Sequence, residues 1–170
     1  MAGEPTYAEA NPLQRAIRSV ASSHPGSWVF VRVARHLDAG VLTATRGRRT
    51  LSSLIAGIPT LQLTTTGAKS GSQRTITLLG LPTEGGVAII ASNFGQKKHP
   101  AWFHNLKAHP HCEVTIDGVS QECRAVEVDG DRPARIWQRG VAIYPGWTEY
   151  EKRTPSREIA VFVLEPTVTR

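Results

Sequence analysis

The sequence is poor in cysteine, methionine and long hydrophobic runs, and each shortage excludes a class of protein. No apolar run approaches the roughly 18 residues that a membrane-spanning helix needs. Residues 1–12 are polar and lack the basic and apolar regions of a secretory signal. The composition, 40% hydrophobic and 20% charged, is ordinary for a soluble globular chain. We therefore expect a cytoplasmic protein.

The only two cysteines, Cys112 and Cys123, flank a predicted β-hairpin. Its turn signal is Asp117-Gly118, with a short β-branched segment on each side. If these two residues form the turn, Cys112 lies directly opposite Cys123 in a hydrogen-bonded pair with Cα atoms about 5.5 Å apart. A disulfide there would be strained and the compartment reducing, so we expect two free thiols.

Histidines gather between positions 99 and 111, but their spacing argues against a metal site. His99 and His104 are separated by about 140° around a helix, so they do not share a face. Pro110 separates His109 from His111, and no carboxylate pair or cysteine set lies nearby. We predict no metal.

The chain of 170 residues is long enough for one domain with a sizeable core. Helical spacing of apolar residues predicts an amphipathic helix over 13–21 and a second helical segment over 30–41. Residues 1–56 are therefore predicted to form an N-terminal helical arm, and residues 57–170 the main domain. The arm either packs on this domain or a second subunit, or lies on an anionic membrane surface.

From Pro59 onward, short β-branched segments separated by glycine turns dominate. They predict six strands, over 61–66, 75–81, 87–91, 113–117, 119–128 and 159–165. Two helices are predicted among them, over 100–108 and 131–142. No βαβ alternation is visible, so the pattern indicates an antiparallel, barrel-like sheet with helices at its ends, an α+β protein.

The net charge of +6 favours an anionic partner, which could be nucleic acid, a membrane surface or an acidic cofactor. Aromatic and basic residues are not interleaved in the manner of nucleic-acid recognition motifs, which disfavours that partner. In the loop Gly67–Gly71, two glycines allow close backbone approach while Lys69 and Ser70 offer a charge and a hydroxyl to a phosphate. It is not a Walker A loop, because Ala68 intervenes and a strand follows. A solvated hairpin loop is the alternative.

The segment Ser92–Leu106 strengthens the anion hypothesis. A predicted strand ends at Ser92, and a helix begins at Pro100 with Lys97 and Lys98 just ahead of it. Free N–H groups at a helix start, with two ammonium groups, suit an anion. In the helix itself, Trp102 could instead be core packing and Asn105 a structural bridge.

Tyr144, Trp147 and Tyr150 recur every three residues around Pro145-Gly146. They could line one wall of a cavity or simply fill the core. A phenol is protonated at pH 7, so a tyrosine here would suit a proton or hydrogen-bond donor better than a base.

These three ordered blocks resemble the deazaflavin-dependent nitroreductases, the branch of split β-barrel oxidoreductases that uses coenzyme F420. The resemblance covers roughly Leu42 to Pro166. It implies an FMN-binding-like split barrel and hydride transfer from F420H2 to a quinone, a nitroaromatic or another electron-poor acceptor. The phosphodiester and oligoglutamate tail of this cofactor suit a basic groove.

The resemblance also implies residue roles. Cofactor-binding positions are Lys69, Ser70, Gly71, Arg74, Ser92, Asn93, Phe94, Gly95, Lys97, Lys98, Pro100, Trp102 and Asn105. The substrate-binding positions are Tyr144, Trp147 and Tyr150, and the catalytic ones are Tyr150, Ser92 and Tyr144. Family members often carry Arg where this chain has Ala68, a loss for which Arg74 could compensate, and Trp147 replaces a common Tyr.

Two other readings stay open. The chain could be an FMN-dependent or haem-binding split-barrel relative, or a carrier that binds a deazaflavin without catalysis. By analogy with other split barrels, a homodimer is also open.

Overall fold

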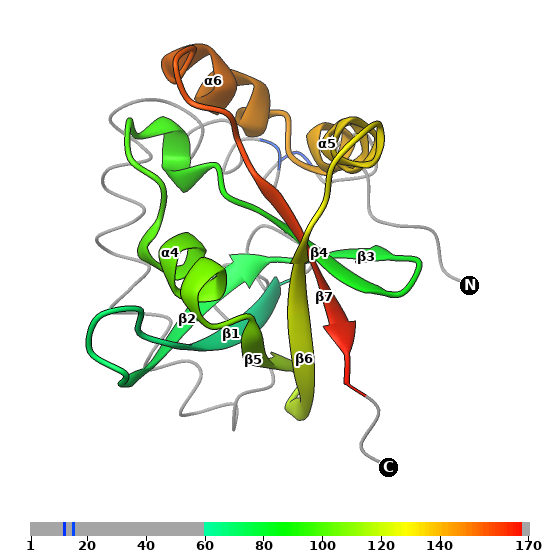
Figure 1. Cartoon of the computed structure of the whole chain (residues 1–170). Coiled ribbons are helices and arrows are strands. Elements are labelled where there is room, and N and C mark those ends of the chain that lie inside the picture. Colours follow the sequence, from blue (N-terminus) through cyan, green and yellow to red (C-terminus); the bar gives the residue numbers. More distant parts are fainter. Residues whose placement is uncertain (1–11, 13–14, 16–59, 168–170) are drawn as a thin grey trace.

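The computed structural model describes residues 60–167, together with Pro12 and Arg15 (Figure 1). Pro12 and Arg15 are helical and exposed. The rest of the predicted arm lies outside the described residues. Its two helices, its membrane association and the boundary at residue 56 therefore stay predictions.

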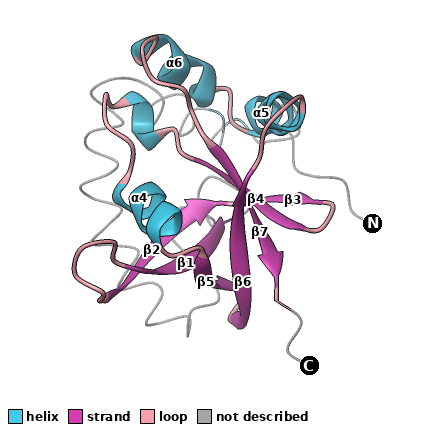
Figure 2. Ribbon diagram, viewed as in Figure 1, coloured by secondary structure: helices cyan, strands magenta, loops and turns pink. Residues whose placement is uncertain are grey.

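The described range contains a seven-stranded sheet with helices around it (Figure 2). The strands are β1 (Thr60–Thr66), β2 (Gln73–Leu79), β3 (Leu81–Thr83), β4 (Gly86–Ile90), β5 (His111–Ile116), β6 (Val119–Glu127) and β7 (Val161–Pro166). The helices are α4 (Ala101–Ala108), α5 (Arg132–Ile143) and α6 (Gly146–Arg153), with a 3-10 turn η1 (Asn93–Gly95). Within that range, no helix is long and apolar enough to cross a bilayer.

The strand order explains why the sheet curls. Neighbours follow the order β2-β1-β5-β6-β7-β4-β3, and every neighbouring pair is antiparallel. β2 and β3 are separated only by Gly80, yet they form opposite edges of the sheet. A chain that passes directly from one edge to the other requires the sheet to curl until those edges approach. The result is the predicted antiparallel α+β architecture.

The predicted strand over 75–81 is wrong in one respect, because the structure divides it into β2 and β3. A Cβ atom on Gly80 would lie 2.7 Å from Cδ2 of Leu61, so the chain bends at Gly80 in close contact with β1. Glycine permits this approach because it has no side chain. The strand count is therefore seven rather than six.

Helix α6 is an element for which the sequence analysis made no prediction. Pro145 is the residue that precedes the helix, and the polar segment after it completes two turns. Proline is well suited to a helix start because its missing N–H is not needed there.

Both faces of β4 and β7 are buried, which accounts for their continuous apolar sequences. Figure 1 shows α5 and α6 together at one end of the sheet and α4 beside β1 and β2. One core cluster joins Ala88, Ile90, Val161 and Val163 to Ile136, Ile143 and Trp147 of α5 and α6. The other joins Ile89, Phe162 and Leu164 to Trp102 and Leu106 of α4. Helices α5 and α6 thus pack on one face of these strands, and α4 on the other.

The β5–β6 hairpin has the predicted register, with Cys112 opposite Cys123. Both thiols are free and buried, which confirms the prediction. Burial, with a smaller contribution from Cys123, raises the pKa of the Cys112 thiol to about 12.

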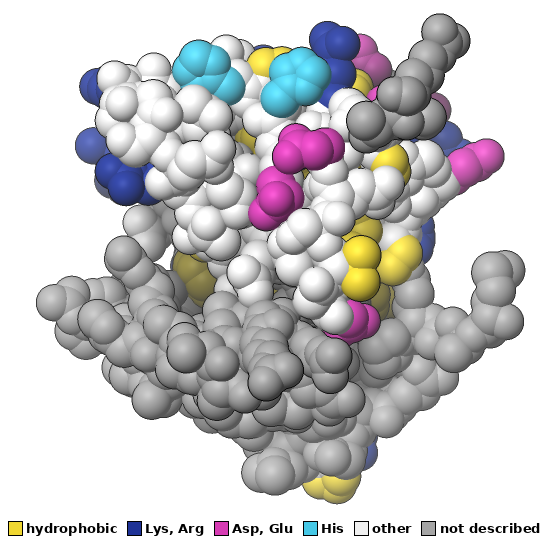
Figure 3. All heavy atoms as spheres, turned by 90° about the horizontal axis from the view of Figure 1, so that it is seen from below, with side chains coloured by type: hydrophobic (Ala, Val, Ile, Leu, Met, Phe, Trp, Pro, Cys, Tyr) yellow, Lys and Arg dark blue, Asp and Glu magenta, His cyan; other side chains and the backbone are white. Residues whose placement is uncertain are grey.

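Seen from below, the described surface carries acidic side chains across its middle and basic ones mainly at its rim (Figure 3). Acidic and basic side chains are therefore segregated on this described face.

Candidate functional site

The turn after β4 has an unusual backbone. Asn93, Phe94 and Gly95 follow one another with φ values of 46°, 55° and 73°, all in the left-handed region. A residue other than glycine costs of order 1–3 kcal/mol in such a conformation, and strain of this kind collects at ligand sites. Surrounding contacts must therefore hold the turn in place.

Arg157 supplies one set of these contacts. Its guanidinium donates to the carbonyl oxygens of Ala91 and Ser92 at 2.9 Å each, and to that of Gln96 at 3.2 Å. Burial lowers the pKa of Arg157 from its ordinary value. The arginine thus joins both ends of the turn.

Helix α6 holds the turn from another side. The Phe94 ring meets the Tyr150 ring edge-on, with centroids 5.9 Å apart. A Cβ atom on Gly95 would lie 3.1 Å from both the Cα of Tyr150 and the Cβ of Arg153. This close packing, together with the positive φ, requires glycine at position 95.

The turn and the start of α4 offer hydrogen-bond donors. Within residues 60–167, the amide N–H groups of Asn93 and Lys97 and the hydroxyl of Ser92 have no hydrogen-bond partner. Helix α4 begins after Pro100, and although the amide of Phe103 donates to the carbonyl of Pro100 at 3.1 Å, the amides of Ala101 and Trp102 have no hydrogen-bond partner within the described residues. Lys97 and Lys98 are exposed beside them. This donor set fits a phosphate or carboxylate group.

The Gly67–Gly71 loop is tied to α4 by one buried side chain. Asn105 accepts from the amide of Ala68 and donates to Oγ1 of Thr65, both at 3.0 Å. The loop closes on itself through a hydrogen bond from the amide of Gly71 to the carbonyl of Gly67 at 2.8 Å. Asn105 is therefore the structural bridge that the sequence allowed, and it sets the loop beside the α4 helix. Lys69 and Ser70 are exposed on that loop.

The two tyrosines face each other within the core. Their hydroxyl oxygens are 2.9 Å apart, and the exposed fractions are 6% for Tyr144 and 2% for Tyr150. Burial raises the pKa of both phenols. For Tyr150, the hydrogen bond with Tyr144 and the nearby Arg153 act in the opposite direction but are smaller. Both groups are therefore protonated donors at neutral pH, in agreement with the chemistry expected of them.

Comparison with known proteins decides the family. The family described as F420H(2)-dependent quinone reductase matches residues 34–166. The chain belongs to this family. Its relatives include an F420H(2)-dependent quinone reductase of Mycobacterium tuberculosis, which is 36% identical over 140 residues, or 80% of this chain and 91% of that one.

Solved structures agree with this assignment. An F420-H2 dependent reductase, FDR-A, is 37% identical with a TM-score of 0.58, over 63% of this chain and 94% of that chain. A structure described as a domain-swapped dimer is 34% identical with a TM-score of 0.60, over 83% of this chain and 99% of that chain. The predicted split-barrel fold, the oxidoreductase class and the F420 cofactor are thereby confirmed.

Some of the residues that were predicted at the site of this reductase pack in its hydrophobic core. Trp102 is buried with its ring edge toward Phe162, at 6.2 Å between centroids. Trp147 is buried between Trp137 and Tyr144, also at 6.2 Å from each ring centre. Arg74 lies exposed on edge strand β2, directly after the loop. The structure therefore brings the turn and the tyrosines together, with the loop joined to them through α4.

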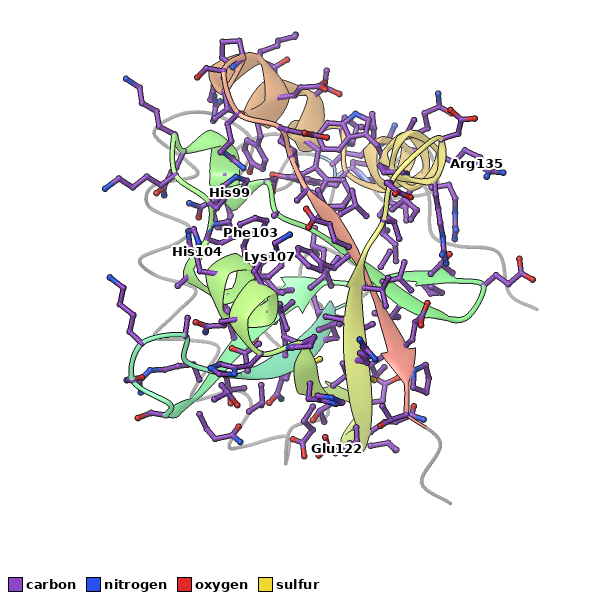
Figure 4. All side chains as sticks on the ribbon, viewed as in Figure 1. His99, Phe103, His104, Lys107, Glu122 and Arg135 are labelled. Carbon is purple, nitrogen blue, oxygen red and sulfur yellow. The ribbon has the colours of Figure 1, made fainter. Side chains whose placement is uncertain are left out.

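His99 lies just before α4, and its neighbours determine which ring nitrogen accepts a hydrogen bond and which carries the proton. Its ring stacks on Phe103 at 4.0 Å, and Nη1 of Arg157 lies 3.4 Å from its Nδ1. Because arginine only donates, Nδ1 is an acceptor and the proton is on Nε2. Burial first, then the Arg157 charge, lowers the pKa of His99. Figure 4 shows the side chains of Phe103, His104 and Lys107 on α4, with His99 next to them.

Arg157 is the residue that sequence reasoning missed. It follows Pro155-Ser156 in a segment without periodicity, and the backbone carbonyls that it binds are 61 to 66 positions away. No local signal marks such a contact.

Proposed function

We propose that this reductase oxidises F420H2 and reduces a quinone to a quinol. A hydride and a proton together convert the quinone to the quinol and leave oxidised F420. The observation that carries the proposal is the direct packing of the strained Asn93–Gly95 turn, which offers amide donors, against the helix that holds Tyr150. The proposal therefore places the cofactor and the acceptor next to each other.

On the cofactor side, exposed amines and backbone amides suit the anionic part of F420. Lys69, Lys97 and Lys98 are all exposed around α4, and the amides of Asn93 and Lys97 have no partner within the described residues. We assign the phosphodiester and tail to this region. When bound, reduced F420 supplies the hydride.

On the acceptor side, Ser92 and Tyr150 hydrogen-bond the acceptor oxygen, and Tyr150 donates the proton. The proton that F420H2 would release on losing its hydride then restores the Tyr150 phenol. Tyr144 supports this role, because its hydrogen bond to Tyr150 stabilises the phenolate left behind. The buried setting keeps both phenols protonated until transfer occurs and excludes water from the reaction.

The decisive experiment is a fluorescence titration of the purified chain with oxidised F420, repeated with FMN. The protein is then mixed with F420H2 and a soluble quinone, and F420 absorbance is followed. We expect tight F420 binding, weak FMN binding and quinone-dependent oxidation. Binding without oxidation would indicate a carrier, and tighter FMN binding would indicate a flavin enzyme.

Two variants test the assigned roles separately. Tyr150→Phe should lower turnover and leave F420 affinity nearly unchanged, and unchanged turnover would remove Tyr150 from the mechanism. Lys69→Ala should weaken F420 binding and reduce its salt dependence. Lys152→Ala is the matched control, because Lys152 is an exposed lysine on α6 paired with Glu149.

A homodimer is part of the same proposal, supported by the structural relative described as a domain-swapped dimer. Light scattering coupled to size-exclusion chromatography would test it. A mass of about 18.5 kDa at all concentrations would contradict it.

A further inference from the structure

Arg157 controls the direction of backbone groups that it does not itself touch. In a trans peptide, the C=O and the following N–H point to opposite sides. The carbonyls of Ser92 and Gln96 point at the guanidinium. The N–H groups of Asn93 and Lys97 belong to those same two peptides, so they are directed away from Arg157.

Neither of these two amides has a hydrogen-bond partner among residues 60–167. The positive charge of the guanidinium also offsets the partial negative charges of the three carbonyl oxygens that it binds behind the turn. Without it, these oxygens would repel an anion. One side chain therefore sets both the orientation of the donors and the sign of the local potential.

The segment that carries Arg157 is anchored to the tyrosine helix. The amide of Arg157 donates to the carbonyl of Thr154 at 3.1 Å. The buried hydroxyl of Thr154 donates to the carbonyl of Tyr150 at the same distance. Arg157 thereby fixes the turn relative to the helix that contains the proposed proton donor.

We propose that Arg157 is a positioning residue that aims the amides of Asn93 and Lys97 at the anionic part of the cofactor. The inference rests on the proposed function for the identity of the ligand. A lysine cannot replace it, because one ammonium group cannot span the carbonyls of Ala91, Ser92 and Gln96 with the geometry of a planar guanidinium.

The test compares Arg157→Lys and Arg157→Gln with Arg132→Gln, by F420 fluorescence titration over a range of salt concentrations. Arg132 also donates to a loop carbonyl, that of Glu84, but away from the turn. Both Arg157 variants should bind F420 about tenfold more weakly or worse, since charge-assisted hydrogen bonds are lost. The salt dependence of Arg157→Lys should match the parent, because lysine keeps the positive charge and Arg157 does not contact the anion, and Arg132→Gln should bind as the parent does.

Equal affinity of Arg157→Lys and the parent would overturn the inference, because charge alone would then suffice. A parent that does not bind F420 would instead refute the proposed function. If the Arg157 variants do not fold, amide NMR of the ¹⁵N-labelled parent gives the answer. The Asn93 and Lys97 amide resonances should shift on F420 addition, and no shift at either would overturn the inference.

Discussion

Replacing Gly140 with alanine should destabilise the reductase, although alanine favours a helix. Gly140 lies in α5, and a Cβ there would be 2.0 Å from Cζ3 and 2.5 Å from Cε3 of Trp147. Carbon atoms in contact are normally about 3.5–4.0 Å apart. The Trp147 ring would have to move by roughly 1.5 Å, but it is buried between two other aromatic rings.

The magnitude follows from two opposing effects. Alanine gains about 1 kcal/mol over glycine from helix propensity, whereas overpacking costs about 1–3 kcal/mol and more when a rigid ring is displaced. We expect Gly140→Ala to lower the free energy of unfolding by about 1–2 kcal/mol, measured by urea denaturation followed by circular dichroism.

A double-mutant cycle isolates the cause. In a Trp147→Leu background the clashing ring atoms are absent, so Gly140→Ala should there be neutral or stabilising by up to about 1 kcal/mol. The reasoning would be refuted if Gly140→Ala had the same effect in both backgrounds, or if it left the parent fully stable.

Three further predictions concern polar and ionisable groups. Asn105→Ala should reduce the free energy of unfolding by about 1–3 kcal/mol in urea denaturation, because two hydrogen bonds are lost; an unchanged midpoint would contradict the bridge. Cys112 and Cys123 should react slowly with iodoacetamide at pH 8 in the native protein and rapidly in denaturant, as read by mass spectrometry, because burial raises both thiol pKa values. The lowered pKa of His99 means that the unfolded state binds its proton more tightly, so stability should fall as the pH drops below about 6.5. His99→Gln should reduce this loss of stability, measured by urea denaturation at pH 5–8. An unchanged pH dependence would contradict the role assigned to His99.

Local signals in the sequence were sufficient for some elements. The Asp-Gly turn and the alternation on either side of it fixed the β5–β6 register, including the cysteine pair. Gly80 gave no such guidance, because the bend there depends on Leu61, which is distant in the sequence but 2.7 Å from a Cβ at that position. Close approach between strands is not readable from one segment alone.

In the candidate site, too, local sequence predicted some features, whereas others depend on contacts between distant residues. Its loop, turn and helix start were predicted from glycine, lysine and proline, which act through local backbone geometry and charge. Tyr144 and Tyr150 were singled out by their spacing, but the hydrogen bond between their hydroxyls was not predicted, because it depends on how α6 packs beside α5. Arg157 was missed because it acts across more than 60 positions. Side chains that bind backbone carbonyls leave no compositional mark.

The position of β7 in the sheet has a consequence for the order in which the protein can assemble. It is the last described strand to be synthesised, and it is the only neighbour shared by β6 and β4 in the described sheet. Before it emerges from the ribosome, the β2-β1-β5-β6 portion and the β4-β3 portion have no strand between them. The turn after β4 and the loop after β1 therefore acquire their final relative positions only after β7 has been synthesised. A nascent chain that ends before residue 161 should be unable to bind the cofactor, however long the folding time allowed.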